Sequence, residues 1–600
     1  MKISPAQIRL ASVLAFLAIA GGLIYFSNFS QFQVSAYQAA VAHSMSHNFT
    51  DWLFGAVDPA GTVSLDKIPG SYWITAIFVR IFGFHDVTVL APNGLATIGA
   101  VLAMALAGRR IAKFNTASDA LSDTVALATG LIILATPIIS AVARSNEPES
   151  FFLLYMALAF HRGVVALQTG KRSQLIFAGL WIGVALQTYM IEAWVLWPAL
   201  IIAWFAVANK RRITKVVDLL IAGASSLALS LLWIVIVTLT PASSRPYVGG
   251  TLQNSAWEMV FGYNALGRLS ATNDPHLFRS FTPKFAGEAG IFRLFNIQDA
   301  GQIGWLIVAA AVALIALFLV QEFDATLVLA GVSFVLLYLE YSFVAGMHQY
   351  YTAIIAMPIA IVLAYLISHG KAWMLILVGL VGAISAFVIN SLYTGYFPVM
   401  SWLPFVALVA LVVLIGLQPE RRGLLGLTLT VALVVTPAVW SIDVINRPAP
   451  TNPVAGPELP KWARVTGTAH TDADTGPVIH RNLKQDIAAT KELKAFLAAN
   501  QVGHPKYPLA TFGAQIAAPI MNLSGLEVLP MGGFSGFDTV PTIDKFKQLI
   551  ADKQLQYVIY SSGWDKRGAG GNTEKIALHV LNNCKHVSTN LFGELYHCTY

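Results

Sequence analysis

Long apolar stretches alternate with short polar connections, and this alternation constrains the fold more than any other feature of the chain. Of the 600 residues, 56% are hydrophobic and only 12% are charged, whereas soluble domains carry about 25% charged residues. A helix needs about 20 apolar residues to cross the hydrocarbon core of a bilayer. We therefore predict a polytopic α-helical membrane protein. The thirteen predicted spans lie near 7–27, 88–108, 122–140, 150–168, 174–189, 191–208, 216–240, 303–320, 325–345, 350–368, 372–393, 399–417 and 424–442.

Lys and Arg fall almost entirely on one side of this pattern. If the N-terminus is inside, every inner connection except the 321–324 turn contains a base, as the positive-inside rule requires. The expected protein is multi-pass in the cytoplasmic (inner) membrane, with its N-terminus inside and its C-terminal domain outside. Inner loops facing anionic membrane lipids account for much of the net charge of +7, so no nucleic-acid partner is needed. The bases of the inner connections are Arg109, Arg110, Lys113, Lys171, Arg172, Lys210, Arg211, Arg212, Lys215, Lys371, Arg421 and Arg422.

The chain divides into a membrane part, a linker and a soluble part. Residues 1–445 form the predicted membrane domain, and the proline-containing stretch 446–478 has the composition of a linker. In 479–600, helices and strands are predicted to alternate, which indicates a soluble α/β domain. The outer loops are 28–87, 141–150 and 241–302, and residues 71–82 in the first are expected to form an interfacial helix. The helices of the soluble domain are predicted near 482–500, 513–523, 541–553 and 573–583, and the strands near 506–511, 526–530, 555–561 and 593–599.

The chain has two cysteines, Cys584 and Cys598, and both lie in the predicted outer domain. In an oxidising compartment they could form a disulfide. Two free buried thiols are the alternative.

Charged residues cluster in the first two outer loops. An acid can act as general base toward an acceptor hydroxyl, and a Lys, an Arg or a carboxylate-bound metal can stabilise a departing phosphate. The alternative is that these are ordinary solvated charges and helix caps. The residues are Asp51, Asp58, Asp66 and Lys67 in the first loop, and Arg144, Glu147 and Glu149 in the second.

The third outer loop combines arginines, amides and aromatic rings. Planar Arg donors suit phosphate oxygens, and flat rings suit pyranose faces, although a well-packed cap would use the same residues. His348 and Tyr350 begin a span at its outer end and could bind phosphate or anchor at the interface. Glu192 occupies a tight outer turn, as a helix cap or a pocket lining. The loop residues are Arg245, Tyr247, Asn254, Tyr263, Asn264, Arg268, Glu288 and Arg293.

The outer domain contains a glycine-rich turn, MGGFSGFD at 531–538. Such a turn can cradle phosphate, but it lacks the Walker lysine, so a tight structural turn facing the membrane domain is favoured. The chain has no GxxxxGK[ST], HExxH or CxxC motif. Few charges fall within the predicted spans, which disfavours ion translocation.

Several long segments resemble bacterial glycosyltransferase family 39-like proteins of the GT-C superfamily, a group of mannosyltransferase-like membrane proteins with a C-terminal extracytoplasmic domain. More distant relatives are the protein O-mannosyltransferases and the lipid A aminoarabinose transferase. The similarity is spread over most of the chain. It is carried by AYQAAVAHSMSHNFTDWLFGAVDPAGTVSLDKIPGSYW, AVARSNEPESFFLL, RPYVGGTLQNS, FGYNALGRL, GEAGIFRLFNIQDAGQIGW, GMHQYYTAIIAMPIA and MGGFSGFD.

The resemblance implies an inverting hexosyl- or pentosyltransferase that uses a polyprenyl-phosphate sugar donor. Lys67 in DKIPG matches the lysine that would meet the donor phosphate, and Glu149 stands where the family has an Asp that organises the site. The acid that protein mannosyltransferases place just after the first span is absent, because the corresponding stretch is FQVSAYQAAV. The base is therefore expected among Asp66, Asp58 and Asp51, in that order.

The sequence leads to one reading and two alternatives. We expect transfer to an extracytoplasmic acceptor, which is a cell-envelope glycan, a lipid or a protein. The phosphate would be held by Lys67 with Arg144, Arg245, Arg268 or His348, and the substrates by Tyr247, Asn254, Tyr263, Asn264, Glu192 and Tyr350. Glu149 is the candidate ligand of a divalent metal, Mg or Mn. The alternatives are a flippase for lipid-linked sugars and a catalytically inactive envelope-assembly scaffold.

Overall fold

The computed structural model divides the chain into two compact units, each assembled from three separate stretches. Unit 1 comprises Met1–Gln33, Leu90–Leu231 and Lys284–Ala469, and unit 2 comprises Val34–Val89, Leu232–Pro283 and His470–Tyr600. Unit 2 thus groups the first outer loop and part of the third with the C-terminal region. The described residues are 4–28, 34–115, 118–207, 210–267, 285–322, 324–393, 398–446, 452–456, 483–534, 536–561, 571–590 and 592–599.

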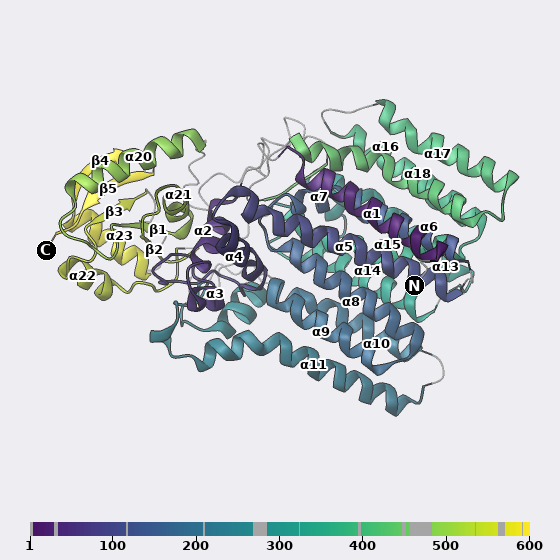
Figure 1. Ribbon diagram of the computed structural model, residues 1–600, viewed down its shortest axis with the longest axis horizontal. Helices are drawn as coiled ribbons and strands as arrows, with labels where there is room; N and C mark the ends of the chain where they lie inside the picture. The colour runs from purple at the N-terminus through teal and green to yellow at the C-terminus, as the bar shows by residue number, and fades with distance from the viewer. Residues whose placement is uncertain are drawn as a thin grey trace. The chain divides into compact units, whose positions relative to one another are not determined.

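Unit 1 is a bundle of long apolar helices lying side by side (Figure 1). The segment Gln349–His369, which includes α15, is 94% buried over its most apolar window, so it runs through the interior of the bundle. Two of the helices, α5 and α11, continue into unit 2. The helices are α1 (Pro5–Phe26), α5 (Asp86–Asn115), α6 (Asp119–Leu134), α7 (Pro137–Ala143), α8 (Glu149–Thr169), α9 (Arg172–Tyr189), α10 (Leu196–Ala206), α11 (Arg212–Leu239), α13 (Trp305–Leu319), α14 (Ala325–Phe343), α15 (Ala356–His369), α16 (Ala372–Ser391), α17 (Pro398–Leu417) and α18 (Arg422–Asp443).

Within the described ranges, 11 helices are long and apolar enough to cross a membrane, or up to 12 if the pair α6 and α7, bent by 71°, forms one span. One of the 11 is the 35-residue segment Arg172–Ala206, which would be about 50 Å long if straight. Yet Arg172 and Lys210, at its two ends, both pair with Asp218. The segment therefore folds back, at Met190 with its φ of 59°, and makes two passes. With the bent pair counted as one span, the passes agree with the thirteen predicted.

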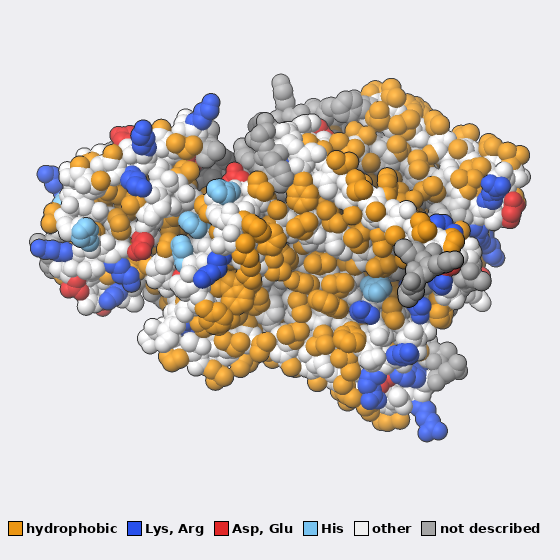
Figure 2. All heavy atoms as spheres, in the orientation of Figure 1, with side chains coloured by type: hydrophobic (Ala, Val, Ile, Leu, Met, Phe, Trp, Pro, Cys, Tyr) orange, Lys and Arg blue, Asp and Glu red, His pale blue; other side chains and the backbone are white. Residues whose placement is uncertain are grey.

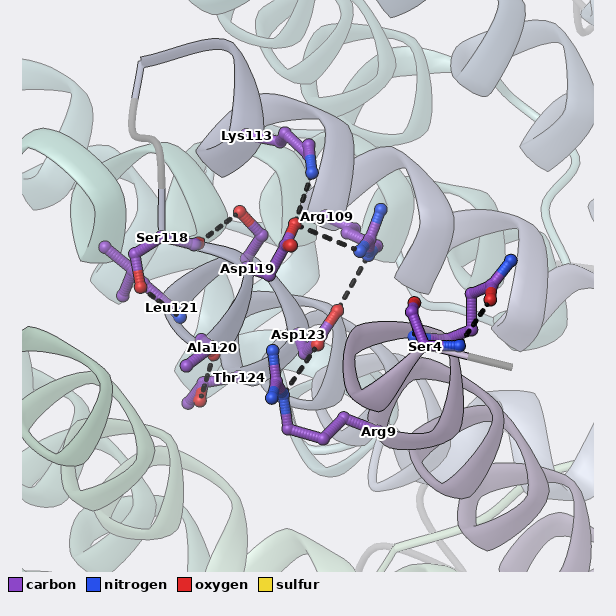
Figure 3. A network of polar contacts seen from close by, with 12 residues as sticks. Ser4, Arg9, Arg109, Lys113, Ser118, Asp119, Ala120, Leu121, Asp123 and Thr124 are labelled. Carbon is purple, nitrogen blue, oxygen red and sulfur yellow. Dashed lines mark hydrogen bonds and ion pairs between the residues drawn. The ribbon is translucent and has the colours of Figure 1, made fainter. Parts of the chain in front are cut away.

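Charged groups of unit 1 gather at one end of the bundle, where Figure 2 shows Lys and Arg beside a largely apolar face. There the Asp123 carboxylate of α6 lies 2.7 Å from Nε of Arg109 on α5 and 3.4 Å from Nε of Arg9 on α1 (Figure 3). One turn earlier, Asp119 pairs with Arg109 at 3.7 Å and with Lys113. These pairs join three helices through bases that the sequence assigns to the inner side.

Unit 2 is built around a five-stranded sheet of order β2-β1-β3-β5-β4. Strands β1 and β2 are parallel, as are β1 and β3, whereas β5 runs antiparallel to both β3 and β4. The strands are β1 (Leu509–Phe512), β2 (Val528–Met531), β3 (Tyr557–Tyr560), β4 (Lys585–Asn590) and β5 (Gly593–His597). The helices are α2 (Ala36–Met45), α3 (Phe49–Phe54), α4 (Gly70–Phe82), α20 (Leu483–Asn500), α21 (Ala514–Ser524), α22 (Ile543–Ala551) and α23 (Asn572–Asn583).

Each face of the sheet buries its own hydrophobic core. On one face, side chains of β3 pack with α22 and α23, for example Val558 with Phe546 and Ile576. On the other face, Leu509 of β1 packs with α20 and α21, and this core also contains Tyr37 of α2 and Tyr72 of α4. The first outer loop therefore shares a core with the C-terminal residues, because its apolar side chains complete that layer.

The local predictions agree well with these elements. Helix α4 occupies the predicted interfacial segment, and every predicted helix and strand of 479–600 is present within a few residues. The sequence missed β4, which follows α23 after a single residue. Cys584 and Cys598 form a disulfide that ties the start of β4 to the end of β5, so the alternative of two free thiols is wrong.

Candidate active site

The three acids of the first outer loop have different surroundings. Asp58 is 1% exposed, and its carboxylate accepts hydrogen bonds from the backbone N–H groups of Thr62 and Val63. Burial raises the pKa of Asp58 to about 6, although those hydrogen bonds oppose the shift. Asp51 accepts from the side-chain amide of Asn48 at the start of α3, and burial raises its pKa too. Both carboxylates thus stabilise local turns.

Asp66 is arranged differently, because one of its oxygens remains available. The Tyr263 hydroxyl donates to Oδ2 over 3.2 Å, and the Asn264 side-chain amide donates to the backbone oxygen over 2.8 Å. Asp66 is 4% exposed, yet Oδ1 has no hydrogen-bond partner among the described residues. A buried oxygen without a partner is costly, and Oδ1 is the acceptor of Asp66 that no described residue uses. Lys67 follows directly and is half-buried.

Two glycines of the third loop allow the backbone to approach Asp66 closely. Val63 and Tyr247 form a parallel bridge, and after it the chain passes over Asp66 at Gly249 and Gly250. A Cβ at Gly249 would lie 2.2 Å from the backbone oxygen of Ser64, and one at Gly250 would lie 3.2 Å from Cβ of Asp66. Gly250 also has a φ of 70°, which favours glycine. Larger residues would displace this segment.

The glycine-rich turn after β2 contributes a second acid. The backbone N–H of Gly250 donates to both oxygens of Asp538, each over 3.0 Å. Asp538 is 1% exposed, and burial, with a smaller contribution from the Asp66 charge, holds its pKa well above the usual range. The turn is tight because Gly533 lies against this carboxylate, where an added Cβ would be 1.9 Å from Oδ2.

Tyr37 lies close to both acids. It belongs to FQVSAYQAAV, the stretch that lacks the acid of the protein mannosyltransferases. Its hydroxyl is buried without a partner among the described residues, and its ring packs 4.7 Å from that of Phe534 in the glycine-rich turn. Burial raises the pKa of Tyr37 well above its usual range, and the charges of Asp66 and Asp538 add to this shift. We call Tyr37, Asp66, Gly250, Tyr263, Asn264 and Asp538 the Asp66 cluster.

The remaining third-loop candidates shape the loop. The Arg245 guanidinium donates to Oδ1 of Asn254 over 2.6 Å and to the carbonyl of Val237 at the end of α11. The Tyr247 hydroxyl donates to the carbonyl of Thr251 over 2.9 Å. These contacts order the backbone leading to Gly250. Roles for Arg245, Tyr247 and Asn254 in binding stay predictions, and Arg268 lies outside the described residues.

The second outer loop belongs to unit 1. Arg144 is 7% exposed, and its guanidinium donates to the carbonyls of Ile24 and Ser27 at the C-terminal end of α1, over 2.8 and 2.9 Å. Burial lowers its pKa to about 10, so it is charged at neutral pH. The Glu147 carbonyl accepts from the Asn93 side chain over 2.6 Å. These contacts fix the loop at the end of the bundle, and phosphate binding by Arg144 stays a prediction.

Unit 1 also gathers candidates that are distant in sequence. The rings of His348 and Tyr350 stack at 4.7 Å, and Tyr351 meets Tyr189 edge-on at 5.8 Å. Tyr189 interacts electrostatically with Glu149 and Glu192, and Glu192 accepts from Tyr341. Nδ1 of His348 lies 2.8 Å from Oδ1 of Asn452. We call Glu149, Tyr189, Glu192, His348, Tyr350 and Tyr351 the tyrosine cluster.

No group of three or more His, Cys, Asp or Glu among the described residues could hold a metal ion. The tyrosine cluster contains two acids with one histidine, but its other members are phenols, which are poor ligands for Mg²⁺. Binding of a divalent metal at Glu149 stays a prediction, since Mg²⁺ can be held by one or two carboxylates together with substrate phosphates.

Sequence reasoning missed Tyr37 and Asp538 as members of the site. Tyr37 lies in FQVSAYQAAV, and nothing in that stretch marks a tyrosine as a member of a site. Asp538 was visible in the MGGFSGFD turn, but its partner Gly250 is far away in the sequence, and no local pattern connects them.

Comparisons with known proteins agree with this architecture. Residues 66–236 match the family model "Dolichyl-phosphate-mannose-protein mannosyltransferase", and residues 493–583 match "Putative mannosyltransferase YkcB-like, C-terminal". Two Bacillus subtilis (strain 168) proteins, "Putative mannosyltransferase YkcB" and "Putative mannosyltransferase YycA", are each 24% identical over 93% of this chain, and cover 88% and 91% of their own lengths. The crystal structure of ArnT from Cupriavidus metallidurans bound to undecaprenyl phosphate aligns over 98% of both chains, with a TM-score of 0.54 and 12% identity. That likeness shows a shared fold.

Proposed function

We propose that this chain is a membrane glycosyltransferase of the GT-C type, like the mannosyltransferase families that it resembles, and that it transfers a sugar from a polyprenyl-phosphate carrier to a hydroxyl group of an extracytoplasmic acceptor. The acceptor is a cell-envelope glycan, a lipid or a protein. The observation that carries the proposal is the buried carboxylate of Asp66, which is held by Tyr263 and has one oxygen that no described residue uses, with Lys67 next in the sequence.

In the proposed reaction, Oδ1 of Asp66 removes the proton of the acceptor hydroxyl. The acceptor oxygen attacks the anomeric carbon, the bond from that carbon to the phosphate oxygen breaks, and polyprenyl phosphate leaves. Attack opposite the leaving group inverts the anomeric configuration. Lys67 stabilises the negative charge that develops on the phosphate.

Asp66 suits the base better than Asp58 or Asp51, because the other two acids hold backbone or local side-chain donors. This ranking keeps the order that the sequence suggested. The undecaprenyl phosphate bound to the C. metallidurans protein supports a polyprenyl-phosphate carrier for the sugar.

The proposed orientation places the N-terminus inside and unit 2 outside a cytoplasmic membrane. Two observations support it. The basic network around Asp123 marks an inner side by the positive-inside rule, and the Cys584–Cys598 disulfide is typical of an oxidising compartment.

The deciding experiment is mass spectrometry of purified protein incubated with a panel of short polyprenyl-phosphate sugars and crude envelope acceptors. Wild type should consume one donor and release polyprenyl phosphate. Asp66→Asn should lower turnover by about 100-fold or more, and Lys67→Ala by a comparable factor. Asp552→Asn, an exposed acid elsewhere in unit 2, is the matched control and should behave as wild type. Donor binding without consumption would reject the proposal in favour of a flippase or a scaffold.

A further inference from the structure

We propose that Asp538, from the C-terminal region, is a positioning residue of the active site, acting through Gly250 to hold Asp66 and Tyr263 in their reactive arrangement. The C-terminal region would then complete the active site in addition to any role in acceptor binding. This inference rests on the proposed function, because it concerns the same carboxylate.

The first step of the argument is the contact itself. Both oxygens of Asp538 accept from a single backbone N–H, that of Gly250, which fixes the direction of that peptide. Hydrogen bonds that involve a carboxylate are stronger than those between neutral groups. The buried position of Asp538 excludes competing water, so the contact is a strong restraint on the third loop.

The second step is what Gly250 touches on its other side. A Cβ there would meet Tyr263 Cδ1 at 3.1 Å and Asp66 Cβ at 3.2 Å. The Gly250 backbone thus separates the Asp538 carboxylate from the pair that forms the reactive group. Any shift of the 248–251 segment moves the surface against which Asp66 and Tyr263 rest.

The third step is that the surroundings of Asp538 are shared with the site. Tyr37 and Asp66 interact electrostatically with it, and the Tyr247 hydroxyl lies 2.8 Å from Oγ1 of Thr539, the next residue. Two successive residues of the turn therefore contact the third loop at points that flank the close approach to Asp66. A turn that only joined β2 to α22 would need neither contact.

The test compares two variants that disturb the same carboxylate from opposite sides. Asp538→Ala removes the acceptor oxygens, whereas Gly533→Ala introduces a methyl group where Oδ2 of Asp538 lies. Gly525→Ala is the matched control, since Gly525 has a similar φ of +69° but no atom within 4 Å of an added Cβ. Full-length protein is used throughout, and each variant is first checked for its thermal transition.

Two readouts are combined. In hydrogen–deuterium exchange, both test variants should speed exchange in peptides covering 60–68 and 247–254, and the control should not. In turnover assays, kcat should fall by about tenfold to a hundredfold, while KM for the donor stays as in wild type. For Asp538→Asn, which keeps one acceptor oxygen, the exchange rates and kcat should lie between those of Asp538→Ala and those of wild type.

Unchanged exchange in both peptides would overturn the proposal, and so would faster exchange with wild-type kcat, since Asp538 would then only dock the turn. If wild type transfers no sugar from any donor, the proposed function fails. In that case the hydrogen–deuterium exchange measurement still decides whether Asp538 holds the 248–251 segment against Asp66.

Discussion

The hydroxyl of Tyr263 donates a hydrogen bond to Oδ2 of Asp66 over 3.2 Å. The two residues are far apart in the sequence, in the third and first outer loops, and the bond leaves Oδ1 as the remaining acceptor. A base held in this way presents its available oxygen in one direction, which favours proton transfer from a bound hydroxyl.

Replacing Tyr263 by Phe should therefore impair catalysis more than stability. Loss of one hydrogen bond to a charged group corresponds to about 1.5 kcal/mol, or roughly a tenfold lower kcat. Steady-state turnover of the preferred donor measures this. Tyr596→Phe, which removes a hydroxyl bonded to Glu594 within the sheet, should keep wild-type kcat. Equal rates in wild type and Tyr263→Phe would mean that the contact does not orient the base.

The buried Asp58 should make stability depend on pH. Its folded pKa of about 6 exceeds the ordinary value of 3.8, so folding favours the protonated form. The stabilisation is fully present below about pH 4 and is lost as pH rises through 6, with a difference on the order of 3 kcal/mol. Thermal transitions between pH 4 and 7 should fall less steeply for Asp58→Asn than for wild type. Parallel curves for the two proteins would contradict this.

Two acids one turn apart on α6 should differ in their importance to the bundle. The Asp123 side chain is 5% exposed and pairs with Arg9 and Arg109, whereas that of Asp119 is 32% exposed (Figure 3). Because the buried Asp123 carboxylate accepts charge-assisted hydrogen bonds from both arginines, Asp123→Asn should destabilise by about 1.5–3 kcal/mol. Asp119→Asn should change stability little. Thermal unfolding in detergent compares the two variants. Equal losses of stability would show that burial of the carboxylate does not determine its contribution.

The disulfide between Cys584 and Cys598 should stabilise unit 2. The two residues are separated by 14 positions, and closing a loop of that size stabilises by about 3 kcal/mol through the unfolded chain. The double serine variant should unfold at a lower temperature, and reductant should lower the transition of wild type but not of the variant. A reductant effect on both proteins would point to another cause.

Local patterns predicted most of the fold. Apolar stretches of spanning length located the helices of unit 1, and the alternation of helix and strand patterns located the elements of 479–600. Strand β4 was missed because its sequence KHVSTN is polar and follows α23 without a turn signal. This segment is a strand because it pairs with β5, and that pairing is not visible in the local sequence. The sharp reversal at Met190 falls where the predicted spans 174–189 and 191–208 meet.

The candidate site was predicted only in part. The residue types of the first loop singled out Asp66 and Lys67, but composition could not separate Asp66 from Asp58. That separation comes from the backbone donors of Thr62 and Val63, which only the folded turn supplies. Asp538 depends on a contact between distant segments, and distant contacts leave no periodic signal in one sequence.

The shared core of unit 2 has a consequence for biogenesis. Tyr37 and Tyr72 are synthesised long before Leu509 and Leu595, which belong to the same core. The first outer loop must therefore wait, with apolar side chains exposed, until those residues have been made. A premature stop codon before β1 would remove a terminal segment and also leave the first outer loop without the layer it packs against, so quality-control proteases should recognise the truncated product.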